Sequence, residues 1–385
     1  MNTPFTALSE MIRLTAPFPE SVTVKAWKAR AKRIIGVAYL AVPEEIIHAA
    51  GMLPFRVSGD NEPLPMELAD SQLLPNNCSV MRGIWQQVLE DKYAFLDGMV
   101  NSPVCDGMRR LHDNWLEFKK LPYMDIIYFP RRATEDALLM YLTDLERWRE
   151  RLSELRGQRI RDNELVRSIA LYNRTRELMQ QFYELRKRAR PPVTGVEALE
   201  VMKASGRMPR EQYNTLLEQL LDEITRSGRE IKKGKRLMIV GNDVHNSNWM
   251  AALEELDAVV VTDEMLTVGT RYFWGKVDTS LPPMEGIARH YLFNRPQDST
   301  IYLSNRYDHI LQLAEAYRVD GVVSNVVRFC APLENDKPWL KKQMNQRGIP
   351  ILELGVDYCE KPSGQMKTRV EAFLEMLRNQ AGVPA

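Results

Sequence analysis

The stretch RIIGVAYLAVPEEIIHAAGMLPFRVSG, residues 33–59, decides the fold. Its first ten residues form a short apolar run that is typical of a buried strand. Pro43 and two glutamates then begin a helix, because proline and acidic side chains are favoured in a first turn. The helix ends at Gly51, and MLPFRVSG follows as a second strand. This order of strand, helix and strand predicts a parallel α/β unit.

Further segments on either side extend the same pattern. FLDGMVNS (95–102), a helix from Cys105 and MDIIYFP (124–130) predict a second unit of the same kind. Between residues 137 and 190 the apolar spacing changes to that of long amphipathic helices, with Asp162 or Asn163 as the expected N-cap of DNELVRSIALYNRTRELMQQFYELRKRAR. Another helix is expected at 209–230.

The α/β pattern resumes at Lys235. Strands are expected in RLMIVGN, DAVVVTDE, VDGVVSN and IPILELGV, and helices in WMAALEEL and SGQMKTRVEAFLEMLRNQ. We therefore predict an α/β protein with two similar open parallel-sheet domains of the Rossmann or flavodoxin-like kind. Residues 1–136 form the first, 137–234 an intervening helical segment, and 235–385 the second. Such sheets bind ligands outside the carboxyl ends of their strands, where Cys105 and Cys330 are expected to lie.

Composition narrows the class of protein. The 385 residues include 52 basic and 51 acidic side chains, a net charge of +1, and no segment concentrates one sign. Nucleic-acid binding is therefore not expected. No signal-peptide core and no run of about 18 apolar residues is present, so we expect a cytoplasmic protein with no membrane partner.

Several catalytic motifs are absent. The chain has neither G-x-G-x-x-G nor G-x-x-x-x-G-K-[ST], so neither a dinucleotide fingerprint nor an ATP-binding phosphate loop is predicted. C-x-x-C, H-E-x-x-H and G-x-S-x-G are missing too, which disfavours zinc ribbons, thioredoxin-like pairs, zincins and serine hydrolases. On spacing alone, each of the four cysteines would be interpreted as a small buried hydrophobe.

The sequence around three cysteines changes that interpretation. NNCSVMRG at Cys78, NSPVCDGMRRLHDNW at Cys105 and SNVVRFCAP at Cys330 resemble the cysteine boxes of the 2-hydroxyacyl-CoA dehydratase and benzoyl-CoA reductase family. VPEEIIHAAGMLPFRVSG and SGQMKTRVEAFLEML resemble segments near the two ends of the same proteins. The five segments occur in the family's order over nearly the whole chain.

The resemblance implies a [4Fe–4S] cluster between two α/β domains, with Cys78 and Cys105 from the first domain and Cys330 from the second as ligands. Thiolate ligands of iron–sulfur clusters can come from distant loops. Three protein ligands would leave one iron position for water, another ligand or substrate. Cys359 lies outside the three boxes, and we interpret it as a buried or surface thiol; a fourth ligand of the cluster is the alternative.

The resemblance also implies partners and a mechanism. Family members receive a low-potential electron from separate ATP-hydrolysing iron–sulfur activator subunits, supplied by ferredoxin, and pass it to an acyl-CoA substrate. In the dehydratases a ketyl radical allows loss of the 2-hydroxyl, whereas the reductases add electrons and protons to the ring of benzoyl-CoA. A paralogous iron–sulfur subunit is expected as the partner of this chain.

Other catalytic candidates follow from position and resemblance. His48 could donate a proton, because an imidazole exchanges protons near neutral pH; a helix residue with a satisfied hydrogen bond is the alternative. Glu45 is either a first-turn acid or a base for dehydration. Arg109 and Arg110 follow Cys105 and could meet the phosphates of CoA, or lie in solvent. GNDVHNS (241–247) is a substrate-loop candidate by position alone.

From these residues we rank three candidate functions. The first is a subunit of a benzoyl-CoA reductase, because His48 and the overall pattern of segments resemble the small reductase subunits. The second is a subunit of a 2-hydroxyacyl-CoA dehydratase. The third is an electron-relay or structural subunit whose paralogous partner binds the substrate.

Overall fold

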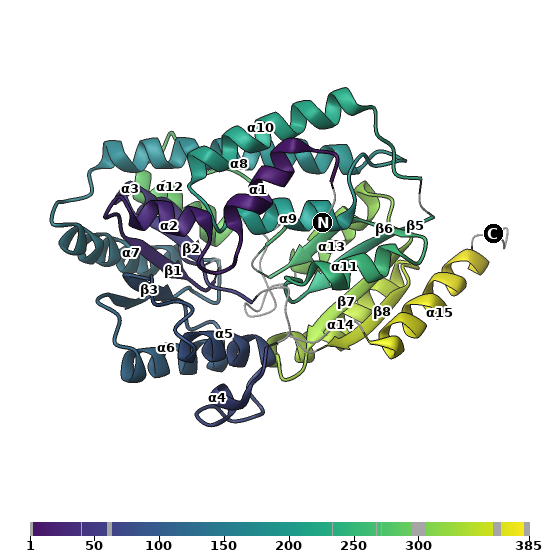
Figure 1. Cartoon of the computed structure of the whole chain (residues 1–385), viewed down its shortest axis with the longest axis horizontal. Coiled ribbons are helices and arrows are strands. Elements are labelled where there is room, and N and C mark those ends of the chain that lie inside the picture. The colour runs from purple at the N-terminus through teal and green to yellow at the C-terminus, as the bar shows by residue number, and fades with distance from the viewer. Residues whose placement is uncertain are drawn as a thin grey trace.

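Two four-stranded sheets, each with all strands parallel, form the centre of the chain (Figure 1). Their strand orders are β2-β1-β3-β4 and β6-β5-β7-β8, so the second sheet repeats the order of the first. This repetition confirms the predicted α/β class with two similar open parallel-sheet domains. The computed structural model describes residues 3–39, 41–59, 64–232, 234–266, 268–270, 272–294, 305–356 and 363–380.

Each predicted strand is present, and most are shorter than the apolar runs that predicted them. The strands are β1 (Ile34–Val37), β2 (Leu53–Arg56), β3 (Gly98–Asn101), β4 (Met124–Ile126), β5 (Lys235–Gly241), β6 (Ala258–Met265), β7 (Gly321–Val327) and β8 (Ile351–Val356).

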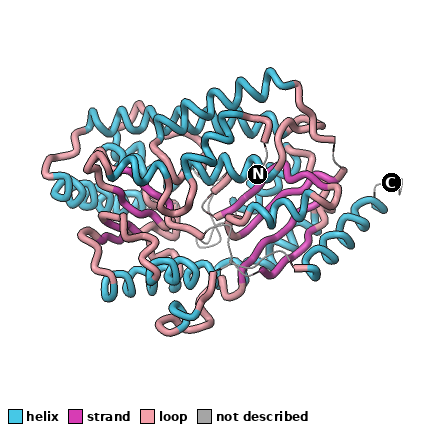
Figure 2. Tube along the Cα trace, in the orientation of Figure 1, coloured by secondary structure: helices cyan, strands magenta, loops and turns pink. Residues whose placement is uncertain are grey.

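Helices surround both sheets (Figure 2). In the first half they are α1 (Thr6–Thr15), α2 (Val22–Lys28), α3 (Glu44–Ala49), α4 (Glu67–Asp70), α5 (Ser79–Leu89) and α6 (Asp106–Phe118). The long helices that follow are α7 (Glu135–Arg156), α8 (Asp162–Arg186), α9 (Gly195–Ser205) and α10 (Arg210–Ser227). The second half adds α11 (Ser247–Glu254), α12 (Pro283–Arg289), the π-helix η1 (His290–Asn294), α13 (Asn305–Ala316), α14 (Ala331–Gln346) and α15 (Gly364–Gln380).

The start of α8 differs by one residue from the prediction. Arg161, instead of Asp162 or Asn163, is the N-cap. Its backbone N–H donates to the Glu164 carboxylate at 2.8 Å, which is half of a capping box. The acidic side chain three residues into the helix therefore fixes where the helix begins.

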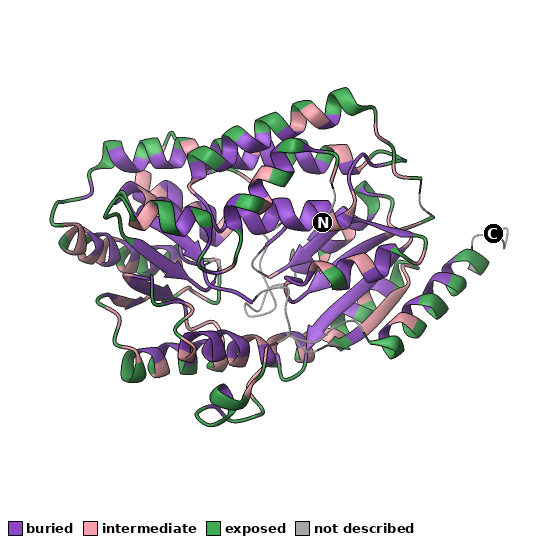
Figure 3. Cartoon of the chain, viewed as in Figure 1, coloured by how far each residue is buried: buried purple, intermediate pink, exposed green. Residues whose placement is uncertain are grey.

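The first sheet is covered on both faces. Apolar side chains of α3, α7, α8 and α12 pack on one face, and those of α2, α5 and α6 on the other. Figure 3 shows most of the strands as buried and the outward faces of the surrounding helices as exposed. Burial on both faces explains why the strands are apolar runs without alternation.

Packing crosses the predicted domain boundaries. Helix α1 packs against α9 and α10 in the core around the second sheet, although it belongs to residues 1–136. Helices α12 and η1 pack in the core of the first sheet. The boundaries at 136 and 234 therefore stay a prediction. Among the described residues, no helix is both long and apolar enough to cross a bilayer.

Candidate functional site

Three cysteines occupy the same local position in the fold. Cys78, Cys105 and Cys330 are the N-cap residues of α5, α6 and α14. Helices α6 and α14 follow the corresponding strands of the two sheets, β3 and β7, so two of these cysteines lie at the carboxyl ends of parallel strands. The N-terminus of a helix favours negative charge, because its first backbone N–H groups lack partners within the helix.

The three thiols line one cavity of about 70 Å³. Cys330 is buried and the other two are partly buried. Most of the remaining lining is apolar, from Val57, Val80, Met81, Ile84, Val104, Met108 and Leu266. We call this cavity the cysteine pocket. Residues that are far apart in the sequence, from both domains, meet there, as the resemblance implied; their role as cluster ligands stays a prediction.

The thiols influence one another. Burial raises the pKa of Cys78 to about 12, and the nearby Cys330 makes the second-largest contribution. Burial also raises the pKa of Cys105 to about 11, and Cys330 contributes in the same direction. Backbone N–H groups of the two helices oppose the shift, which is the expected effect of a helix N-terminus on a thiolate. Without a bound cation, both thiols are therefore protonated at neutral pH.

Asn242, directly after β5, holds Cys330 in place. Its side-chain Nδ2 lies 3.5 Å from the Cys330 Sγ, and its Oδ1 accepts the backbone N–H of Val327 at 2.9 Å. The backbones of Asn242 and Asn325 are also bonded, with an N-to-O distance of 2.8 Å. The ends of β5 and β7 thus position the third thiol together.

The other polar side chains of the cysteine pocket come from loops after strands. Asp243 and His245 follow β5, and Ser58 follows β2. Burial lowers the pKa of His245 well below its usual value, and the charges of Arg207, Lys203 and Arg56 lower it further. Its imidazole is therefore neutral near pH 7. The predicted substrate loop GNDVHNS thus lies beside the cysteines.

The chemistry of these donors fits a cluster with several iron atoms. Among the described residues, no group of three His, Cys, Asp or Glu side chains is arranged to hold a single metal ion. A cluster does not require such a group, because each thiolate binds a different iron atom and the thiols then surround the cluster. Three soft thiols around an apolar cavity match that need better than they match a single ion.

His48 lies away from the cysteine pocket. Its Nδ1 is 2.9 Å from the Ser168 Oγ on α8, and its Nε2 is 3.0 Å from the Glu211 carboxylate on α10. The ring also contacts Tyr172 edge-on. These contacts match the alternative of a helix residue with satisfied hydrogen bonds, and a catalytic role for His48 stays a prediction.

Glu45 is also outside the cysteine pocket. It is fully buried, forms an ion pair with Arg176 and accepts the Tyr291 hydroxyl at 2.8 Å. Burial alone would raise the pKa of Glu45, but Arg176 outweighs it and the pKa is lowered. Its neighbour Glu44 is buried as well and pairs with Arg56. These glutamates therefore make buried ion pairs, beyond the helix-dipole role expected of them.

Arg109 and Arg110 are exposed on α6 and do not appear among the described residues of the cysteine pocket. Arg110 pairs with Asp113 at 2.9 Å on the same helix. Their contact with CoA phosphates stays a prediction. Cys359 lies outside the described residues.

Sequence reasoning missed Ser58 and Tyr39 in the cysteine pocket. Both follow strands of the first sheet, β2 and β1. Position after a parallel strand, the signal that singled out residues 241–247, would have found them.

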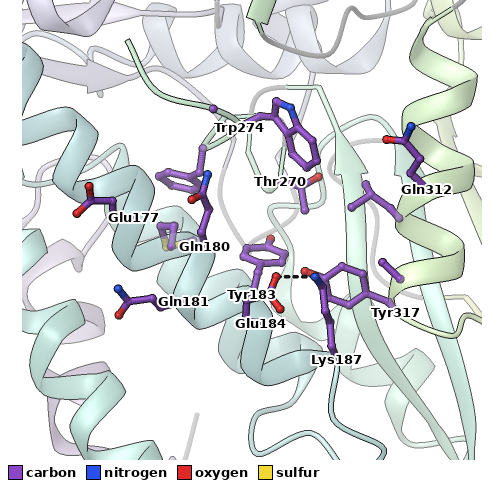
Figure 4. A pocket seen from close by; sticks show the side chains of 15 residues that line it. Glu177, Gln180, Gln181, Tyr183, Glu184, Lys187, Thr270, Trp274, Gln312 and Tyr317 are labelled. Carbon is purple, nitrogen blue, oxygen red and sulfur yellow. Dashed lines mark hydrogen bonds and ion pairs between the residues drawn. The ribbon is translucent and has the colours of Figure 1, made fainter. Parts of the chain in front are cut away.

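A larger cavity of about 700 Å³ lies between α8, the segment after β6 and α13 (Figure 4). Tyr183, Phe273 and Tyr317 contribute aromatic rings to its lining, and the Glu184 and Lys187 side chains, which also line it, form an ion pair. It shares no described lining residue with the cysteine pocket and has no Cys or His among its described walls. It is therefore a separate cavity from the cysteine pocket.

Known proteins with similar sequences extend over almost the entire chain. The chain is 26% identical over 362 residues to the (R)-phenyllactyl-CoA dehydratase beta subunit of Clostridium sporogenes, covering 93% of this chain and 96% of that one. It is 28% identical over 369 residues to a subunit of the benzoyl-CoA reductase of Thauera aromatica, covering 93% of this chain and 92% of that one. It is 23% identical over 379 residues to the (R)-2-hydroxyglutaryl-CoA dehydratase subunit beta of Acidaminococcus fermentans, covering 96% of this chain and 99% of that one.

The family model of the 2-hydroxyglutaryl-CoA dehydratase D-component matches residues 39–377, which include Cys78, Cys105 and Cys330. The match begins two residues after β1 and extends into α15, so it includes every strand of the two sheets except β1. The chain therefore belongs to the 2-hydroxyglutaryl-CoA dehydratase D-component family.

Proposed function

We propose that this chain is an iron–sulfur subunit of an enzyme that acts on acyl-CoA thioesters by single-electron chemistry. One observation carries the proposal: three cysteines from two domains, each at a helix N-terminus, line one cavity. Cys78, Cys105 and Cys330 would hold a [4Fe–4S] cluster. When bound, such a cluster supplies a single electron at low potential.

The surrounding residues would serve that cofactor in two ways. The helix N-termini favour the thiolate form of each cysteine, which offsets part of the cost of burying the charge. The apolar walls of the cysteine pocket keep water away from the bound group and from reactive intermediates of the substrate.

Dehydration of a 2-hydroxyacyl-CoA is the reaction that we place first. The sequence favoured benzoyl-CoA reduction because of His48 and the overall pattern of segments. The His48 side chain bonds to Ser168 and Glu211 and does not line the cysteine pocket, which removes one of these two grounds. The similarity to two dehydratase beta subunits over more than nine-tenths of the chain supports dehydration.

Reduction of benzoyl-CoA is the second candidate. It is supported by the similarity to the Thauera aromatica reductase, at 28% identity. Because these relatives are named as subunits, the chain is expected to work with partner subunits. We propose a paralogous iron–sulfur subunit, an ATP-hydrolysing activator and ferredoxin as those partners.

The cluster is tested by iron content. Iron analysis and visible absorption compare the wild-type chain with the Cys78→Ala, Cys105→Ala and Cys330→Ala variants, all purified without oxygen. Cys359→Ala is the matched control. We expect each of the first three variants to lose most of the iron and the brown chromophore, and the control to keep both. Wild-type iron in all three variants would show that the cysteines hold no cluster.

The reaction is tested with the complete complex of both subunits and the activator. (R)-2-hydroxyacyl-CoA and benzoyl-CoA are supplied separately with ATP and a reductant. Enoyl-CoA formation supports the first candidate and ring reduction the second. Full turnover by His48→Ala would remove His48 from the proton transfer.

A further inference from the structure

The large cavity between α8, the segment after β6 and α13 has the size of a small-molecule site (Figure 4). Its volume of about 700 Å³ lies within the range of about 300–1,000 Å³ that is typical of ligand pockets. None of the three cysteines lines it, and it shares no described lining residue with the cysteine pocket. A ligand bound there would therefore be additional to an iron–sulfur cluster.

Aromatic rings dominate the lining. The four aromatic side chains are Tyr183, Phe273, Trp274 and Tyr317. The Trp274 ring contacts His309 edge-on, with centroids 4.4 Å apart, and the Phe273 ring contacts Tyr272 in the same way at 4.6 Å. All but Trp274 are buried in the protein, so their rings keep fixed positions. Rigid aromatic surfaces of this kind favour a flat ligand, because π systems stack.

Two hydroxyl groups hold the walls of the cavity together. The Tyr183 hydroxyl donates to the Asp263 carboxylate at 2.5 Å, and the Thr270 hydroxyl donates to the Asp263 backbone carbonyl at 2.6 Å. Burial, with a smaller contribution from the Asp263 charge, raises the pKa of Tyr183 well above its usual value, so its hydroxyl is neutral near pH 7. These bonds join α8 to the end of β6 and to the segment that follows it. The cavity is therefore formed before a ligand binds.

Glutamine side chains provide the polar groups that remain for a ligand. Gln180 comes from α8 and Gln312 from α13, the helices on either side of the cavity in Figure 4, and Gln181 follows Gln180. All three are exposed, and within the described part of the chain none of them has a hydrogen-bond partner. A side-chain amide has both donors and an acceptor. The three amides thus suit a ligand whose edge also carries both.

The charged side chains of the lining are balanced. Glu184 pairs with Lys187, and Glu177, the other described acid of the lining, accepts from the Lys276 Nζ at 2.6 Å. No cation of the described lining is left over for a phosphate group. The sequence also has no phosphate-binding loop. The cavity therefore favours an uncharged ligand.

We propose that this cavity binds an uncharged heteroaromatic ring with hydrogen-bond donors and acceptors on its edge, the chemistry of a purine nucleoside. The aromatic side chains would stack on the ring and the glutamine amides would bond to its edge. Adenine has an amino donor beside a ring-nitrogen acceptor, which one side-chain amide can bond at the same time. The nucleoside is either a free molecule or the adenosine end of coenzyme A. The site goes beyond the proposed function and does not depend on the cluster.

Nucleoside binding is measured by calorimetric titration of the full-length chain with adenosine, and with ribose as the reference that lacks the ring. Adenosine should bind and ribose should not. Ala316→Trp fills the cavity from an exposed position at the end of α13 and should abolish adenosine binding. Glu315→Trp, at the exposed neighbouring position outside the described lining, should bind as the wild type does. Absence of adenosine binding to the wild type, or undiminished binding to Ala316→Trp, would refute the site.

A second variant tests the amides without changing the shape of the cavity. Gln312→Leu removes one amide from an exposed position and should weaken adenosine binding about threefold to tenfold. Gln346→Leu, exposed on α14 and outside the described lining, is the matched control and should change nothing. Equal affinity of the two variants would contradict the role of the amides. Adenosine 5′-phosphate should bind no more tightly than adenosine, and a gain of about tenfold would contradict the preference for an uncharged ligand.

Coenzyme A distinguishes the two sources of the nucleoside. Displacement of bound adenosine by coenzyme A would identify the adenosine end of the acyl-CoA substrate as the ligand, and simultaneous binding of both would identify a free nucleoside. Iron content separates this proposal from the proposed function. Ala316→Trp with wild-type iron and no adenosine binding supports the nucleoside site, whereas a wild type that binds adenosine and holds no iron refutes the cluster alone.

Discussion

At the scale of single residues, Glu45 is a buried carboxylate whose charge is balanced by its neighbours. Its carboxylate is inaccessible to solvent, with Arg176 on one oxygen and Tyr291 on the other. Removing one partner from a buried ion pair leaves an uncompensated charge, which costs far more than the loss of an exposed pair.

Arg176→Met is therefore expected to lower the free energy of unfolding by about 3–5 kcal/mol. Arg174→Met, two residues away on the same helix, removes an exposed pair with Glu218 and should cost about 1 kcal/mol or less. Urea unfolding of both variants measures the difference. Similar stabilities of the two variants would show that Glu45 does not depend on Arg176.

The cysteine thiols make stability depend on pH in a defined direction. Burial raises the pKa of Cys78 to about 12 in the folded chain, whereas an unfolded cysteine ionises near its usual value of 9.0. Between these values the unfolded chain loses a proton that the folded chain keeps, so the folded state is destabilised as pH rises. Below pH 9 both states are protonated and the contribution is constant.

In the cluster-free chain, the free energy of unfolding should therefore fall from pH 9 upward, and part of that fall should disappear in Cys78→Ala. Urea unfolding of both proteins at pH 7, 8, 9 and 10 measures the difference. The curves should be parallel up to pH 8 and converge above it. A constant separation over the whole range would contradict the raised pKa.

At the scale of elements, the end of β5 decides where Cys330 lies. Gly241 has a φ of +114°, and a Cβ there would lie 2.3 Å from the Asn325 carbonyl oxygen. Only glycine allows the two strands to approach so closely while the chain turns into Asn242, which contacts Cys330. The turn thus joins the strand to the cysteine pocket.

Gly241→Ala should destabilise the chain by more than about 1 kcal/mol, because both the dihedral angle and the contact are unfavourable. It should also lower the iron content, since Asn242 would move. Gly355→Ala is the matched strand control, because a Cβ there meets nothing within 4 Å. Thermal unfolding and iron analysis give the two results, and wild-type values for Gly241→Ala would refute the argument.

Local pattern predicted the elements better than it predicted their contacts. The apolar run at 33–42 indicated a strand, but β1 ends at Val37, and Ala38 and Tyr39 line the cysteine pocket. Apolar spacing cannot distinguish a strand from a buried loop, because both exclude water. Helix α3 was predicted, but the direction of His48 towards α8 and α10 depends on helices more than a hundred residues away.

For a similar reason, the spacing of the cysteines in the sequence could not predict that they meet in the fold. Cys78 and Cys105 precede different helices, and Cys330 belongs to the second sheet, so only the arrangement of both domains brings the thiols together. The resemblance of the surrounding segments predicted that meeting before any geometry was known.

For the whole molecule, the connections between the two domains are unequal. Helix α8 packs against α3 and α12 of the first core and also against β6 of the second sheet, so packed helices join the domains on one side. At the cysteine pocket, a small apolar cluster of Val326, Val327, Cys330 and Leu333 meets Cys78 and Val80. An iron–sulfur cluster bound by thiols from both domains would add a covalent connection at this small apolar contact.

Loading the cluster should therefore slow backbone hydrogen exchange at the first turns of α5, α6 and α14, and leave exchange in α8 nearly unchanged. The thermal midpoint should rise as well, because metal–thiolate binding stabilises only the folded arrangement. Cys330→Ala removes the ligand of the second domain, so iron addition should protect α14 in the wild type and not in this variant; Cys359→Ala should behave as the wild type. Equal exchange at all three helix starts with and without iron would mean that the thiols do not connect the domains.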